Sequence, residues 1–210
     1  MTGVLIYSSI TTYSVIVPLL WGLLHYKSIK ASRTILALLI ISFIAECSSL
    51  LTIVFFNSNL YKIGLIYTIF EVLLLSYFYL ESSAFKYKIT LVATSILISV
   101  YLLIIYLLNY GGVDIPYAII SIYEIIIVSI YMLNNTKNIL GNWRFTVFFA
   151  YFQYNILAIG VFSMVDFIEK HQEYLVYYRI LHSTANLFLY ILITIGLYQC
   201  KKHFLKVSSL

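Results

Sequence analysis

The sequence predicts an all-α membrane protein with seven transmembrane helices. Of its 210 residues 62% are hydrophobic and only 10% are charged, and the mean hydropathy is +0.97. Soluble domains carry about 25% charged residues, so a chain this apolar cannot hide its surface inside a water-soluble globule of this size. The apolar runs are continuous rather than alternating, and each approaches the roughly 20 residues that cross a bilayer as a helix, which excludes barrel strands.

Seven such runs fill nearly the whole chain and form a single transmembrane domain, residues 1–210. The first run is expected to be a retained helix, because residues 1–3 carry no positive charge and no small-residue cleavage site follows. Pro18 is expected to kink this helix, and Pro116 stands where the fifth begins, a favoured place for proline. The short connections leave no room for a kinase, nuclease or DNA-binding module. The predicted helices are about 4–25, 34–56, 60–80, 87–109, 116–134, 144–166 and 174–200.

The basic residues predict the orientation of these helices. Ten of the thirteen lysines and arginines lie in alternate loops and the C-terminal tail, and such loops are cytoplasmic. The N-terminus is therefore expected outside and the C-terminus in the cytoplasm. The net charge of +5 is explained by basic loops that contact lipid head groups and orient the helices, so no nucleic-acid partner is expected. The ten residues are Lys27, Lys30, Arg33, Lys86, Lys88, Lys137, Arg144, Lys201, Lys202 and Lys206.

Strongly polar residues fall near the middle of five of the predicted helices. At about 1.5 Å of rise per residue, they converge on one slab between the midplane and the outer face. One acid at the bilayer centre costs about 2.5–3.5 kcal/mol, so three acids should face the bundle interior or a wet cavity. The candidate ligand-binding residues are Glu46, Glu71, Glu124, Gln153, Asn155, Arg179, His182 and Asn186, with Tyr67, Ser121 and Tyr190 in support.

Two patterns favour a common interior face. Arg179, His182, Asn186 and Tyr190 recur at spacings of three and four, which predicts one stripe on the last helix. Residues 68–80 (TIFEVLLLSYFYL) also align with residues 121–133 (SIYEIIIVSIYML), so that both acids take the same place. This alignment indicates either an internal repeat or the chance matching that simple apolar sequences produce.

Two functions are compatible with this polar layer. In the first, carboxylates and aromatic rings bind a small cation, a cationic solute or protons, and the protein acts as a receptor, a sensor or a small transporter. A sensor would pass its signal to a cytoplasmic or membrane partner protein. In the second, the protein is a structural or accessory subunit, and the polar residues only join helices by hydrogen bonds among membrane lipids.

An enzyme is the least favoured class, and no cofactor is expected. The last helix contains no lysine for a retinal Schiff base. The zinc site of the alkaline ceramidase superfamily needs three histidines and an acid, whereas His182 is alone well inside a predicted helix. Cys47 and Cys200 lie at different depths and show no metal-type spacing, so we expect neither a disulfide nor a metal site.

Tyr67 and Glu71 form a Tyr-x-x-x-Glu pattern that aliphatic and aromatic residues follow. In this pattern and in the succession of apolar and aromatic residues over the whole chain, the sequence resembles uncharacterised short seven-helix inner-membrane proteins of Bacteroidetes bacteria. The resemblance implies a multi-pass protein of a bacterial cytoplasmic membrane, and it implies no particular activity.

Overall fold

The computed structural model describes residue 10 and residues 13–29, 32–56, 61–82, 88–108, 114–134, 142–162 and 171–208. It confirms the all-helical class, with seven α-helices within these residues. Three short 3₁₀ turns accompany them: η1 (Tyr13–Val15), η2 (Tyr26–Ser28) and η5 (Gln172–Tyr174). The α-helices are α2 (Ile16–Leu24), α3 (Arg33–Phe56), α4 (Tyr61–Ser82), α5 (Lys88–Leu108), α6 (Asp114–Asn134), α7 (Trp143–Phe162) and α9 (Leu175–Ser208).

Four of these helices are long and apolar enough to cross a membrane. The qualifying segments are Ile63–Glu81 in α4, Lys88–Leu108 in α5, Tyr117–Asn134 in α6 and Arg179–Leu205 in α9. The segment Tyr13–Leu24 is a shorter apolar helix. Length and composition thus favour a membrane protein, while the count of seven crossings and the outside N-terminus stay predictions.

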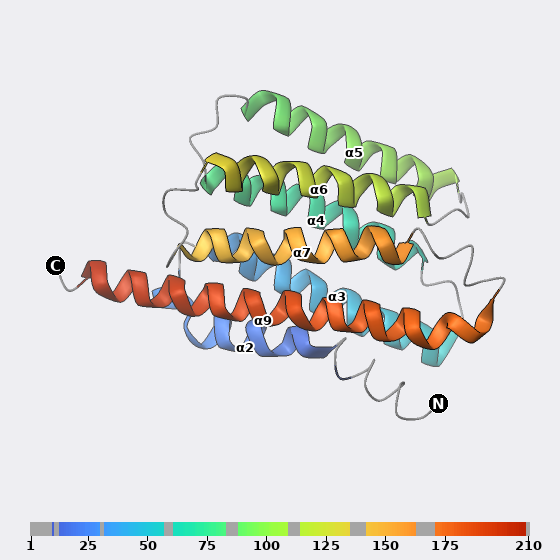
Figure 1. Cartoon of the computed structure of the whole chain (residues 1–210), viewed down its shortest axis with the longest axis horizontal. Helices are drawn as coiled ribbons and strands as arrows, with labels where there is room; N and C mark the ends of the chain where they lie inside the picture. The colour runs from blue at the N-terminus through green and yellow to red at the C-terminus, as the bar shows by residue number, and fades with distance from the viewer. Residues whose placement is uncertain are drawn as a thin grey trace.

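The helices lie side by side along the long axis of the molecule (Figure 1). The contacts between them join six of the described helices in a closed ring. Going round the ring, α3 packs on α4, α4 on α6, α6 on α7, α7 on α9, α9 on α2, and α2 on α3. Helix α5 lies outside this ring against α4, at the upper edge of the bundle in Figure 1. Side chains from six helices therefore point at a common interior, which is where a site can form.

Large aromatic side chains fill one end of this interior, where α4 and α6 end and α7 begins. The ring of Phe148 lies 4.2 Å from that of Tyr131 and 4.9 Å from that of Phe78, measured between centroids. We name Phe78, Tyr79, Tyr131, Trp143 and Phe148 the aromatic plug, and all five are buried. The plug closes the end of the ring that the basic residues predict to be cytoplasmic.

Hydrogen bonds between side chains join neighbouring helices outside the plug. Thr34 Oγ1 of α3 donates to Glu81 Oε2 of α4 at 2.8 Å, and Thr146 Oγ1 of α7 donates to Gln199 Oε1 of α9 at 2.7 Å. Such bonds are the usual way in which polar side chains are accommodated between helices in an apolar medium.

The closest approach of α7 and α9 makes a first prediction. A Cβ atom on Gly196 would lie 2.7 Å from Val147 Cγ2 and 3.2 Å from the backbone oxygen of Trp143. Gly196→Ala should therefore push the two helices apart and cost about 1–2 kcal/mol, seen as a lower melting temperature in detergent. Gly160 of α7 is the matched control, since no described atom lies within 4 Å of its Cβ position. Gly160→Ala should be neutral or slightly stabilising, and equal losses in the two variants would contradict this packing.

Candidate functional site

Two buried carboxyl groups lie in the middle of the ring, on neighbouring helices. Glu71 stands at the centre of α4 and Glu124 at the centre of α6, two helices that pack on each other. Their exposed fractions are 7% and 1%, and they lie close enough for the charge of Glu71 to act on Glu124. Because two carboxylates within electrostatic reach repel each other, a proton or a cation beside them is favoured.

Hydrogen bonds link the carboxyl group of Glu71 to α3. Tyr67 lies one helical turn before Glu71, and its hydroxyl donates to Glu71 Oε1 at 2.8 Å. The same hydroxyl lies 3.2 Å from Ser42 Oγ, which can donate to it. A chain of hydroxyl groups thus leads from α3 to the carboxyl of Glu71 and fixes its position between the two helices.

A hydrogen bond links the carboxyl group of Glu124 to α7. The amide of Asn155 donates to Glu124 Oε2 at 2.7 Å and also to the backbone oxygen of Tyr151 at 2.9 Å. The other oxygen of Glu124, Oε1, is buried and accepts no hydrogen bond from the described residues. This acceptor is therefore available to a proton or a cation at the pair.

Three further tyrosines lie within electrostatic reach of one or both acids. Tyr151 and Tyr154 of α7 lie within electrostatic reach of both Glu71 and Glu124. Tyr190 of α9 lies within reach of Glu71 and beside the hydroxyl of Ser42. Carboxylates combined with aromatic faces bind organic cations well. We name this set the acid cluster: Ser42, Tyr67, Glu71, Glu124, Tyr151, Tyr154, Asn155 and Tyr190.

The acid cluster has no basic counterpart within the described part of the chain. No lysine or arginine there forms an ion pair with either carboxyl group. An ion pair between His171 and Glu173, at 3.5 Å among the described residues, is exposed just before α9. Nor do the described residues gather three or more His, Cys, Asp or Glu side chains as a metal site. The charge of the pair is thus left for a ligand or protons to balance.

Glu46 lies at the edge of the acid cluster. It is half-buried at the middle of α3 and acts electrostatically on Tyr190 and on Tyr13 of η1. Through Tyr190 it approaches the buried pair, so the structure brings it near the cluster without placing it between Glu71 and Glu124.

The predicted stripe on α9 reaches the acid cluster through Tyr190. Asn186 precedes Tyr190 by about one turn, His182 by about two and Arg179 by about three. Asn186 Nδ2 lies 3.4 Å from His182 Nε2, so these two side chains pair with each other nearer the start of the helix. Arg179 is half-buried beyond them.

Two other predicted residues lie beside the cluster rather than in it. Gln153 is half-buried and lies about 200° around α7 from Asn155, so the two amides do not share a face. Ser121 is buried on α6, about one turn before Glu124.

Ser42, Tyr151 and Tyr154 belong to the cluster but were not among the predicted site residues. Their spacing carries a weak indication: Ser42 lies four residues before Glu46, and Tyr151 four before Asn155, so each shares a helix face with a predicted residue. In a chain with 21 tyrosines, composition alone does not separate these from tyrosines of the core or the interface.

The fold and the site together define an all-helical bundle, apolar on its outside, with a pair of carboxyl groups buried at its centre. No protein-family model, no curated protein and no solved structure matches this chain.

Proposed function

We propose that this chain is a seven-span protein of a bacterial cytoplasmic membrane that binds a small cation or protons at Glu71 and Glu124. The observation that carries the proposal is a pair of buried carboxyl groups on neighbouring helices, within electrostatic reach of each other and with no lysine or arginine partner among the described residues. Intramembrane acids are costly to retain, so their usual role is functional. The tyrosines around the pair supply aromatic faces and hydroxyl groups suited to an ammonium group.

The aromatic plug favours a receptor, a sensor or an outward-facing transporter over an open channel. Phe148, Tyr131 and Phe78 stack between the acid pair and the predicted cytoplasmic end. In a transporter, the plug must change conformation before a cation bound at the acid pair reaches the cytoplasm. In a sensor, the same conformational change of the plug carries the signal to the cytoplasmic side. In a sensor, a partner protein at the basic cytoplasmic loops would receive that change.

A structural role is the second candidate, and one observation favours it. The two acids also join helices, since Asn155 bonds Glu124 across α7 and α6, and Tyr67 links Glu71 on α4 to Ser42 on α3. On this hypothesis the carboxyl groups would serve packing only, and no ligand would bind.

Calorimetric titration of the protein in lipid nanodiscs tests the proposal. The probes are methylammonium, sodium, potassium and lithium chloride, and proton uptake is counted in an unbuffered acid titration. We expect either saturable binding of one cation or proton uptake that Glu71→Gln reduces. Glu81→Gln on the same helix is the matched control, because Glu81 is exposed and bonded to Thr34 outside the cluster. The proposal is wrong if no cation binds and Glu71→Gln takes up as many protons as the wild type.

A further inference from the structure

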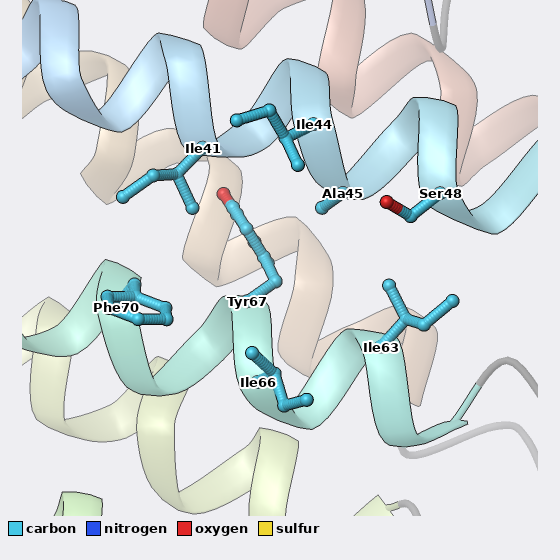
Figure 2. Close-up of a pocket in the computed structure, with 8 residues that line it drawn as sticks. All are labelled: Ile41, Ile44, Ala45, Ser48, Ile63, Ile66, Tyr67 and Phe70. Atoms are coloured by element: carbon cyan, nitrogen blue, oxygen red, sulfur yellow. The ribbon is translucent and has the colours of Figure 1, made fainter.

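A pocket of about 330 Å³ lies between α3 and α4, beside the acid cluster. Its size is at the lower end of the range for sites that hold small organic molecules. Apart from the hydroxyl groups of one serine and one tyrosine, its lining is apolar (Figure 2). The lining residues are Ile41, Ile44, Ala45, Ser48, Ile63, Ile66, Tyr67 and Phe70.

The pocket opens on the outer side of the bundle. Ile44, Ile66 and Phe70 line it and are 56%, 43% and 46% exposed. These residues lie in the middle parts of α3 and α4, at the depth of the hydrocarbon if the bundle spans a membrane. A ligand that enters the pocket from this side therefore needs an apolar part to fill it.

Tyr67 connects the pocket with the acid pair. Figure 2 shows its side chain rising from α4 toward α3, among the pocket residues. The same side chain donates its hydroxyl hydrogen to Glu71 at 2.8 Å. One aromatic side chain thus forms a wall of the apolar pocket on one side and binds the buried carboxyl on the other.

We propose that the cation of this protein is the head group of an amphipathic amine whose alkyl part fills the pocket between α3 and α4. The inference rests on the proposed function, since it needs the acid pair to bind the ammonium group. Charge complementarity places the ammonium group at Glu71 and Glu124, and the apolar lining places the alkyl chain beside Tyr67. The molecule enters sideways from the membrane when Tyr67 turns aside, because the exposed lining residues open the pocket on the outside of the bundle.

A series of primary alkylammonium ions from methyl to hexyl tests this inference in nanodiscs. Burial of one methylene group is worth about 0.8 kcal/mol, so affinity should rise roughly fourfold per carbon until the pocket is full. Partition into the lipid is subtracted with empty nanodiscs of the same lipid, and the Glu71→Gln, Glu124→Gln double variant is titrated beside the wild type. The wild-type series alone decides the question, even if a pocket variant fails to fold.

Ala45→Phe fills the pocket and sharpens the test. This variant should abolish the increase of affinity with alkyl chain length and leave the affinity for methylammonium within about twofold of the wild type. Ala93→Phe is the matched control, because Ala93 is exposed on the outer face of α5 and far from the pocket lining. The control should keep the full dependence on chain length.

The outcomes separate this inference from the proposed function. If methylammonium binds through the two acids but longer chains bind no more tightly, the amphipathic ligand is wrong and the cation site stands. If tight hexylammonium binding persists in the double variant at the wild-type level, the pocket takes alkyl chains without the acids, and the joined site is wrong. If no ammonium ion binds at all, the inference is overturned, and proton uptake then decides the proposed function.

Discussion

The Glu71→Gln, Glu124→Gln double variant is expected to lose cation binding by about 100-fold or more while keeping its fold. An interaction with a charged group contributes about 1.5–3 kcal/mol, so removing two charges costs at least about 3 kcal/mol of binding free energy. Both single variants should weaken binding, and the double variant should abolish it in calorimetric titration. Glu173→Gln, in an exposed ion pair just before α9, is the control and should bind as the wild type does.

The fold of the double variant should survive because glutamine preserves the hydrogen bonds of both acids. An amide oxygen at position 71 still accepts from Tyr67, and one at position 124 still accepts from Asn155. Repulsion between the two groups disappears, so the cation-free double variant should melt at or above the temperature of the cation-free wild type. A clearly lower melting temperature, with binding of cations and protons unchanged, would instead favour the structural subunit.

Composition and hydropathy were sufficient to predict the helical class, because continuous apolar runs leave the backbone no other partner in a membrane. Depth counting placed Glu71 near the middle of its helix, which is where the structure has it. It placed Glu124 in the outer half, whereas α6 begins at Asp114, two residues before the expected start, and has Glu124 at its centre. The polar residues predicted a common interior for the three acids, but which of their helices become neighbours could not be predicted, since periodicity gives only the face of a helix. That α4 contacts α6, with α5 displaced outside the ring, is a property of the assembled bundle.

The α9 stripe shows a second limit of the sequence pattern. The spacing of Arg179, His182, Asn186 and Tyr190 predicts that they share a helix face. Their depth along the helix follows from the sequence only if the helix ends where the apolar run ends. Helix α9 continues to Ser208, past the expected end near residue 200, so its midpoint lies closer to Tyr190 than to His182. Tyr190 is accordingly the residue of this stripe that lies within electrostatic reach of Glu71.

Replacing Phe148 is expected to cause the largest loss of stability in the bundle. Its ring stacks at 4.2 Å on Tyr131 and 4.9 Å on Phe78 and meets Tyr79 at 6.0 Å, so it joins α7 to both α6 and α4. Phe148→Ala should cost about 2–4 kcal/mol, because a buried cavity remains and the contacts between rings are lost. Phe149→Ala is the matched control: the neighbouring ring is 39% exposed on the outside of the bundle and should cost less than about 1 kcal/mol.

The measurement can be made at the plug itself. The chain has two tryptophans, and Trp143 packs on Phe78 with 5.7 Å between ring centroids. In a Trp21→Phe background, the fluorescence of Trp143 reports on plug packing during thermal unfolding in detergent. Phe148→Ala should shift this emission and lower the melting temperature, whereas Phe149→Ala should leave both nearly unchanged. Equal shifts in the two variants would mean that the plug does not hold α4, α6 and α7 together, and the barrier between the acid pair and the predicted cytoplasmic end would lose its support.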